Sequence, residues 1–424
     1  MTSLTEAREL LRQGRIPEAE RAYQRILERS PGEPEALCIV GLAALRAGQA
    51  ARATALLGAA ARLEPGNAVT HQHLGRAQEA GGDPAAALGS YRTALQLRPE
   101  LHVARLQLAA ALERAGERAD ATIQYARALE DAQSQGRWLN PDTTPPTLRP
   151  LVEAAVLAVR RGTQEACARL LEPLTSRYGR AALARVERCV RIYLHEEAVA
   201  YPDPRQRPTF LFFPDLPASA YLDRSLFAWL AQLEAATDSI RAELQALLPS
   251  TTGRERVFTS DELEQANLRG LDQPPSWNGY YFWRHGERRA DNFAACPATA
   301  AALALLPLSH VRGHGPEVLF SVFTPGTHLL PHRGVTNSRL VGHLPLLVPA
   351  DCALNVGGEL HHWQEGRVVV FDDTYEHEAW NRSTRTRVVL IFDLWNPYLT
   401  EVERLAVADL VGAIGDFGQA VKTA

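Results

Sequence analysis

The feature that most constrains this chain is a repeat with a period of 34 residues in its first third. A glycine in the middle of each unit predicts a turn between two helices. A proline at the end predicts where the second helix stops, because its ring cannot continue one. One such unit cannot bury its apolar stripe alone, so the pattern predicts a stacked helical solenoid with a concave face. The positions that keep the period are Gly14, Gly48, Gly82 and Gly116; Ala19, Ala53, Ala87 and Ala121; Tyr23, Leu57, Tyr91 and Tyr125; Pro31, Pro65 and Pro99; and Gly41, Gly75 and Ala109.

Over roughly residues 3–132 this pattern resembles the tetratricopeptide repeat. The resemblance implies a groove that binds a peptide or protein, with a spacer or a self-association surface as the alternatives. Residues 137–149, rich in Pro and Thr, interrupt the helical spacing, which returns from about 150 to 200. We therefore expect a tetratricopeptide repeat domain over residues 1–133 and a helical connector or solenoid cap over 134–204.

Composition excludes several classes of protein. A chain of 424 residues is long enough for two or three domains, and 46% apolar with 22% charged residues is typical of a globular protein. The net charge of −4 gives no reason to expect a nucleic-acid partner. No run of 18 apolar residues predicts a membrane span, and no signal peptide is recognisable. Widely spread cysteines without a CxxC pair favour reduced thiols and a cytoplasmic location: Cys38, Cys167, Cys189, Cys296 and Cys352.

The pattern changes after the Pro-rich stretch at residues 201–208. An aromatic strand is expected at Thr209–Phe213 and an amphipathic helix at Asp223–Leu248. From about residue 317 short strands follow one another, which indicates a sandwich or barrel, with a jelly roll as the natural candidate. The predicted fold is multidomain α + β: an all-α solenoid, then a double-stranded β-helix (jelly-roll) domain with flanking helices over 205–424. Its predicted strands are Val318–Phe323, Arg339–Val348, Cys352–Val356, Arg367–Phe371 and Arg387–Leu394, with a closing helix at 400–421.

Two histidines lie at the ends of predicted strands. His332 follows one strand and His377 precedes another, and the 45 residues between them leave room for strands that bring the two together. Iron(II) oxygenases usually combine two histidines with one carboxylate. That carboxylate normally lies two residues after the first histidine, where this chain has Gly334. We predict an iron centre at His332 and His377; packed core histidines are the alternative.

Arg387 opens a strand that is otherwise apolar. A guanidinium at the mouth of a barrel needs an anion, and its planar fork matches a carboxylate. The distal carboxylate of 2-oxoglutarate would supply one, and Ser321 would donate a second hydrogen bond to it. His343 would meet the other end of this cosubstrate. As alternatives, Arg387 forms a structural bridge with Asp393 or Glu376, and the other two residues only pack.

The remaining polar side chains carry weaker hypotheses. His328 is expected to support the site or the structure without binding metal. The adjacent His361 and His362 would point to opposite sides of a strand and could not easily share a metal. Either of two aspartates could supply the missing carboxylate, and three residues earlier in the chain could line a substrate pocket or pack in the core. The two aspartates are Asp372 and Asp373, and the three residues earlier in the chain are Trp277, Tyr281 and Arg284. No role is predicted for His310 or His314.

From about Arg207 to Arg404 the chain resembles the aspartyl/asparaginyl β-hydroxylase family. Members bind Fe(II) through two histidines, with a glycine in the carboxylate's place. The resemblance implies that His332 and His377 bind the metal, that Ser321 and Arg387 bind the distal carboxylate, and that His343 lies near the proximal one. The matching motifs are Pro325-Gly-Thr-His, Pro331-His-x-Gly-x-Thr-Asn-x-Arg-Leu340, His343-Leu, Trp363-x-Glu-Gly-Arg, Phe371-Asp-Asp-x-x-Glu-His-Glu-x-Trp380 and Asp393-x-Trp-x-Pro397.

The resemblance also implies a function. It predicts a dioxygenase that uses Fe(II), 2-oxoglutarate and O2, with His332, His377 and Arg387 as catalytic residues, and hydroxylates an aspartyl or asparaginyl side chain in a peptide or protein recruited by the repeats. A lipid acyl chain or a carrier-bound amino acid is the alternative substrate, and a non-catalytic scaffold with a degenerate jelly roll is the alternative function. Vertebrate members carry Lys and Arg where this chain has Leu319 and Val341.

Overall fold

A computed structural model describes residues 3–249, 253–270 and 274–424. The chain forms two compact units, one of residues 1–165 with 417–424 and one of residues 166–416. The sequence-based boundaries after residues 133 and 204 divide the chain differently and stay a prediction. In the described ranges no helix is both long and apolar enough to cross a membrane. All five cysteines are free thiols, as the sequence predicted.

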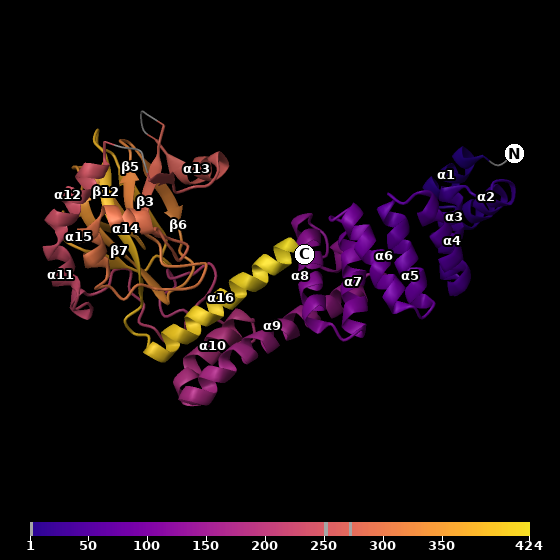
Figure 1. The fold of residues 1–424 in the computed structure, drawn as a ribbon, viewed down its shortest axis with the longest axis horizontal. Coiled ribbons are helices and arrows are strands. Elements are labelled where there is room, and N and C mark those ends of the chain that lie inside the picture. Colours follow the sequence, from indigo (N-terminus) through magenta and orange to yellow (C-terminus); the bar gives the residue numbers. More distant parts are fainter. Residues whose placement is uncertain (1–2, 250–252, 271–273) are drawn as a thin grey trace. The chain divides into compact units, whose positions relative to one another are not determined.

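The first unit begins with four consecutive helix pairs, which confirms the repeat (Figure 1). The turn glycines have φ between 72° and 87°, a backbone conformation that glycine adopts without strain. A side chain at Gly75 would lie 2.7 Å from the ring of Tyr91, so the repeated glycine leaves room for the repeated aromatic residue. The pairs are α1 (Leu4–Arg12) with α2 (Ile16–Arg29), α3 (Pro34–Arg46) with α4 (Ala50–Leu63), α5 (Ala68–Ala80) with α6 (Pro84–Leu97), and α7 (His102–Arg114) with α8 (Arg118–Ser134).

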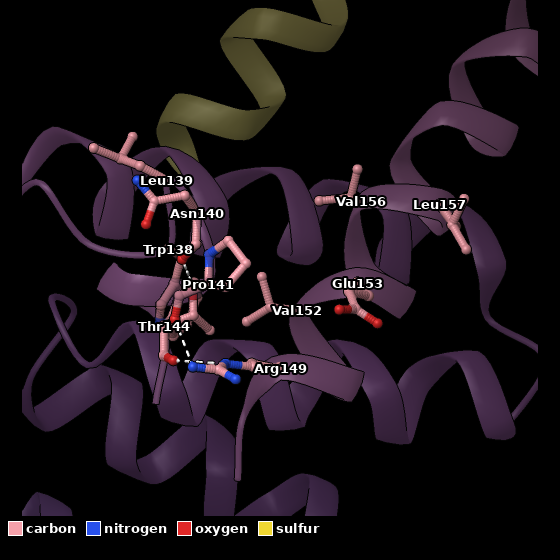
Figure 2. Close-up of a pocket in the computed structure, with 10 residues that line it drawn as sticks. All are labelled: Trp138, Leu139, Asn140, Pro141, Thr144, Arg149, Val152, Glu153, Val156 and Leu157. Carbon is pink, nitrogen blue, oxygen red and sulfur yellow. Dashed lines mark hydrogen bonds between the residues drawn. The ribbon is translucent and has the colours of Figure 1, made fainter. Parts of the chain in front are cut away.

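The Pro-rich segment after α8 is folded against the start of α9 (Arg149–Tyr178). It contains the short 3-10 helix η1 (Pro141–Thr143), and Arg149 donates hydrogen bonds to the carbonyls of Pro141 and Thr144. Segment and helix together line an apolar pocket of about 440 Å³ (Figure 2). The side chains of Leu139 and Leu157 at this pocket are exposed.

The second unit contains two packed β-sheets, all of whose strand pairs are antiparallel. From β5 onward the chain passes repeatedly from one sheet to the other, which confirms the predicted jelly roll. The larger sheet has the order β1 (Arg254–Arg256), β3 (Trp277–Arg284), β5 (Val318–Phe323), β12 (Arg387–Trp395), β7 (Arg339–Leu347) and β10 (Val369–Phe371), with β4 (Glu287–Arg288) beside β3. The smaller has β2 (Leu268–Arg269), β6 (His328–His332), β11 (His377–Asn381), β8 (Cys352–Val356) and β9 (Glu359–His361).

The larger sheet is buried on both faces. Alternate residues such as Phe320, Leu344 and Leu390 pack in a core with a layer of helices on one face. Their strand neighbours, such as Phe323 and Val389, pack on the other face against residues of the smaller sheet. The covering helices, visible beside the sheet in Figure 1, are α11 (Leu230–Ala235), α12 (Thr237–Leu247), α14 (Ala290–Ala295) and α15 (Pro297–Leu303).

A third core of the same unit lies where helices outside the jelly roll pack against Trp395 of β12 and the extended segment around Leu211. The end of α9 packs with α10 (Ala184–Tyr193) and with α16 (Glu401–Thr423), which is the predicted closing helix. The remaining short elements are the 3-10 helices η2 (Arg180–Leu183) and η3 (Arg224–Leu226), and helix α13 (Asp261–Asn267).

Two sequence predictions of local structure are wrong, and strand β3 was missed. Thr209–Phe213 is extended, but only Leu211 forms a bridge, because this segment pairs with the loop after β6 instead of with a strand. The helix expected at Asp223–Leu248 begins only at Leu230, after the 3-10 helix η3, and it is interrupted at Ala236. There the Thr237 hydroxyl donates a hydrogen bond to the backbone carbonyl of Glu234 at 2.6 Å. Strand β3 was not predicted, because its centre is buried on both faces and lacks polar–apolar alternation.

Candidate metal and anion site

Two histidines meet where β6 and β11 pair. His332 is the last residue of β6, His377 is the first of β11, and the antiparallel register places them opposite each other. Their ring centroids are 4.0 Å apart. The strands between them in sequence therefore bring the two together, as their spacing predicted.

The backbone fixes the tautomer of both rings. Nδ1 of His332 lies 2.8 Å from the carbonyl oxygen of Leu330, and Nδ1 of His377 lies 3.1 Å from that of Tyr375. A carbonyl oxygen can only accept, so each Nδ1 carries the proton and each Nε2 keeps a lone pair. Burial lowers the pKa of both rings, that of His377 to about 3. Two neutral imidazoles with free Nε2 atoms are the form that a metal ion requires.

A carboxylate fills the space beside Gly334. The Gly334 N–H donates to the carbonyl of Asp373 at 2.6 Å, and a Cβ atom on Gly334 would lie 2.1 Å from the Asp373 carboxyl carbon. No side chain, and so no carboxylate ligand, fits at this position. Asp373 forms an ion pair with Arg339, which also binds Asp393 at 2.9 Å. Burial raises the pKa of Asp373 to about 7.

Neither aspartate completes a three-residue metal site. Asp372 accepts hydrogen bonds from Gln206 at 2.6 Å and from the Thr374 backbone at 2.9 Å, so its role is structural. Within the described parts of the chain, no three His, Cys, Asp or Glu side chains are placed to hold a metal ion together. The geometry thus offers a metal two protein ligands, His332 and His377.

We predict that Gly334→Ala destabilises the jelly roll. The added methyl group would overlap the buried Asp373 carboxylate, and overpacking of this kind costs about 2 kcal/mol. The measurement is the free energy of unfolding in denaturant. Gly412→Ala is the control: it lies in α16 of the same unit, its added Cβ would meet nothing closer than 3.7 Å, and it should unfold no more easily than the parent. Equal stability of the two variants would contradict the steric role of Asp373.

Arg387 is a buried cation without a carboxylate partner among the residues that the structure describes. Its side chain is 1% exposed, and its guanidinium lies 4.3 Å from the ring centre of Phe323 and 4.4 Å from that of Trp363. The structural bridges considered from the sequence are absent among the described residues, because Asp393 pairs with Arg339 and Glu376 with Arg333. Burial lowers the pKa of Arg387 to about 9, which leaves it charged at neutral pH. A buried charge of this kind requires an anion.

Some of the described polar groups around Arg387 also lack hydrogen-bond partners. Ser321 Oγ accepts a hydrogen bond from Arg387 Nη1 at 3.2 Å and a second from Trp277 Nε1 at 2.9 Å. His343 is buried against the rings of Trp363 and Phe371. Arg387 Nε, Trp363 Nε1 and His343 Nδ1 have no hydrogen-bond partner in the described structure. Folded proteins pair nearly all buried polar groups, so this cluster fits a polar ligand with several acceptor atoms.

The strand register explains how these residues come together. Ser321 on β5, Arg387 on β12 and His343 on β7 all lie on the face of the larger sheet that packs toward the smaller one. Leu319 and Val341 lie on the same face and are buried. At these two positions the face of the larger sheet is therefore apolar.

The other candidates from the sequence lie elsewhere or have structural partners. His328 Nε2 bonds to Glu378 at 2.8 Å, and Arg284 pairs with Glu255 and stacks on Tyr281. His361 packs near Tyr221, and His310 against Trp283. From the sequence, Trp277 could line a substrate pocket or pack in the core, and no role was given to Trp363 or Phe323 beyond membership of a motif and of a strand. No spacing signal could have identified the last two, since only the fold places their rings beside Arg387.

Known proteins match both units of the chain. A family model described as aspartyl/asparaginyl beta-hydroxylase matches residues 234–397, and a tetratricopeptide repeat model matches residues 4–68. An ornithine lipid ester-linked acyl 2-hydroxylase of Rhizobium tropici is 35% identical over 178 residues, 41% of this chain and 60% of that protein. The aspartyl/asparaginyl beta-hydroxylase of Homo sapiens is 35% identical over 142 residues, 33% of this chain and 18% of that protein. Aspartate beta-hydroxylase domain-containing protein 2 of Mus musculus is 30% identical over 251 residues, 58% of this chain and 70% of that protein.

Proposed function

Because this chain belongs to the aspartyl/asparaginyl β-hydroxylase family, we propose that it is an Fe(II)- and 2-oxoglutarate-dependent dioxygenase that hydroxylates an unactivated carbon. The observation that carries this proposal is Arg387, a buried cation without a carboxylate partner in the described structure. It lies on the same sheet face as His343, whose pKa is lowered by burial and by the nearby Arg387 and His377. A site with a cation at one end and metal-binding residues at the other is what a bound 2-oxoglutarate requires, because its distal carboxylate is an anion.

Each residue has a defined part in this proposal. His332 and His377 would hold Fe(II) through Nε2, and the metal with 2-oxoglutarate and O2 supplies the oxidising power. Arg387 and Ser321 hold the distal carboxylate and so set the depth at which the cosubstrate binds. His343 donates to, or accepts from, the groups nearer the metal through its free Nδ1. The rings of Phe323 and Trp363 exclude water from the guanidinium.

The substrate that we propose first is an aspartyl or asparaginyl side chain in a peptide or protein recruited by the repeats. In the first unit, helices α3, α5 and α7 and the start of α9 line a groove of about 550 Å³. A groove along the first helices of successive units suits an extended peptide. Its lining residues are Leu45, Arg76, Glu79, Ala80, Gln107, Ala110, Arg114 and Leu151.

A second candidate substrate is a lipid acyl chain. The relative from Rhizobium tropici is an acyl hydroxylase by name, and this chain has the apolar residues Leu319 and Val341 beside the proposed cosubstrate site. An apolar wall favours a methylene chain, whereas an aspartyl substrate requires a cation for its carboxylate.

Product analysis tests the function and separates the substrates. The full chain is incubated with Fe(II), 2-oxoglutarate and O2, and succinate is measured with protein extract, with lipid extract and with neither. A gain of one oxygen atom on proteins supports the first substrate, and the same gain on lipids supports the second. Absence of Fe(II) binding, of 2-oxoglutarate binding and of succinate in every arm would refute the proposed dioxygenase.

The groove yields a prediction that depends on recruitment by the repeats. Arg76 lines the groove and has no ion-pair partner among the described residues, so its donors are free for a peptide. Arg76→Ala should lower kcat/KM for a protein substrate roughly tenfold, since arginines are frequent binding hot spots. Succinate formation without substrate should not change, because the groove lies outside the jelly roll.

The matched control is Arg92→Ala. Arg92 is an exposed arginine on α6, the second helix of the same repeat, and it does not line the groove. Its replacement should leave kcat/KM unchanged. Equal kcat/KM for Arg76→Ala and Arg92→Ala would contradict recruitment through this groove, and would favour a substrate that reaches the jelly roll directly.

A further inference from the structure

Large apolar side chains are exposed around the pocket that follows α8 in the first unit (Figure 2). Leu139, Val156 and Leu157 line this pocket and are 58%, 42% and 63% exposed. Single exposed leucines are ordinary on a protein surface, but a group of them beside an apolar pocket indicates an interaction site. The repeat groove proposed for substrate recruitment is lined by other residues, so this surface is available for a different partner.

The pocket keeps its shape without a partner. Arg149 at the start of α9 donates hydrogen bonds to the carbonyls of Pro141 and Thr144, at 2.8 Å and 3.2 Å. Trp138 is buried, and its ring meets that of His102 edge-on at 4.9 Å. Because this surface is already ordered, binding a partner costs little conformational entropy.

One face of α9 carries an acidic residue, two apolar residues and a basic residue in this order. Glu153, Val156, Leu157 and Arg160 are all exposed, and steps of three, four and seven residues from the first place them on one side of the helix. Neither Glu153 nor Arg160 has an ion-pair partner among the described residues. An apolar stripe between unpaired opposite charges is a surface on which another helix can pack.

We propose that this face of α9 binds the same face of a second copy of the chain, related by a two-fold axis between Val156 and Leu157. An antiparallel pair of helices places Val156 of one copy on Leu157 of the other, and Glu153 of each copy opposite Arg160 of the other. The opposite charges then match twice, whereas a parallel pair would place like charges together. This inference goes beyond the proposed function and does not depend on it.

A second copy fits these charges better than a lipid surface does. Anionic lipids attract Lys and Arg, and Glu153 beside the apolar residues opposes such binding. Leu139 and the pocket lie beside the helix face and add apolar area to the contact between copies. Stable interfaces bury roughly 1,200–2,000 Å² in total, so one helix pair with its flanking pockets favours a dimer that dissociates on dilution.

Charge reversal in the full chain tests the two-fold contact. Sedimentation velocity over a series of concentrations gives the dissociation constant of the parent dimer and of each variant. Glu153→Arg and Arg160→Glu each place like charges opposite each other twice, and each alone should weaken self-association at least roughly tenfold. A mixture of the two variants restores opposite charges at both contacts, and should associate as tightly as the parent.

Removal of the apolar contact is the second test. Leu157→Glu changes the centre of the interface in both copies and should weaken self-association at least roughly a hundredfold. The matched control is Leu63→Glu, at an exposed leucine of α4 in the same unit that does not line the pocket, and its dissociation constant should equal the parent's. All four substituted positions are exposed, so the variants should keep the parent's melting temperature.

Other outcomes would overturn the inference. A parent that stays monomeric throughout the concentration series has no such contact, and flotation of that monomer with phosphatidylglycerol vesicles, lost in Leu157→Glu, would assign the face to a lipid surface. A dimer that Leu157→Glu leaves intact would form elsewhere on the chain. A mixture of Glu153→Arg and Arg160→Glu that associates no better than either variant alone would contradict the antiparallel pairing.

Discussion

His332→Ala is expected to abolish both Fe(II) binding and succinate formation. The geometry provides two imidazole ligands, and the space beside Gly334 is filled by Asp373. Loss of one ligand leaves a single protein nitrogen on the metal. A metal centre contributes several kcal/mol to a reaction, so turnover should fall at least roughly a thousandfold.

Metal content after dialysis and succinate formation from 2-oxoglutarate are the measurements. His328→Ala is the matched control, four residues earlier on the same strand, where the ring bonds to Glu378. It should retain Fe(II). If His332→Ala keeps stoichiometric iron, or if both variants lose it equally, the metal is not held by the His332–His377 pair.

Arg387→Met is expected to weaken 2-oxoglutarate binding more than a hundredfold without destabilising the protein. Two charge-assisted hydrogen bonds to a carboxylate account for this loss, at about 1.5–3 kcal/mol each. The free energy of unfolding of the ligand-free protein should rise instead of fall. Replacing a buried cation that lacks a carboxylate partner with an apolar side chain of similar length removes an uncompensated charge.

Calorimetric binding and the melting temperature of the ligand-free protein test the two halves of this prediction. The matched control is Arg339→Met, on the neighbouring strand β7, because Arg339 does pair with Asp373 and Asp393. Its removal leaves two buried carboxylates unpaired and should destabilise the protein by about 3–5 kcal/mol. A large loss of stability in Arg387→Met, with 2-oxoglutarate binding retained, would identify Arg387 as a structural residue.

The contrast between these two arginines was not predictable from the sequence. Both lie on strands of the larger sheet, and the sequence offered Asp393 as a partner for Arg387. The register instead places Asp393 opposite Val341, and Arg339 is the arginine whose side chain reaches it. An ion pair of this kind depends on which side chains the sheet brings within about 3 Å of each other. The separation of two residues along the chain does not give that distance.

The repeats and the jelly-roll strands β5, β7, β8, β10 and β12 followed from the sequence alone, whereas β6 and β11, which carry His332 and His377, were not predicted as strands. A 34-residue period is a local property, since each glycine, alanine and proline acts within its own helix pair. His332, Gly334, His377, Arg387 and Ser321 were proposed as site residues from local motifs and from the family resemblance, and their roles stay a prediction. Local patterns did not predict β3, because its centre is buried on both faces. They did not predict the helix break at Ala236, where a side-chain hydrogen bond of Thr237 decides the structure.

Gly334 shows most clearly what the sequence determined and what the tertiary structure determined. The sequence by itself showed a glycine where a carboxylate ligand is usual, and predicted a two-histidine site. Only the tertiary structure showed that the space is taken by Asp373, that Arg387 has no carboxylate partner in the described chain, and that Trp277 occupies an acceptor position of Ser321. The physical reason is that residue types and turns are encoded locally. The free volume beside a residue, its ion pairs and its hydrogen-bond partners instead depend on residues that are distant in sequence and meet only in the folded sheets.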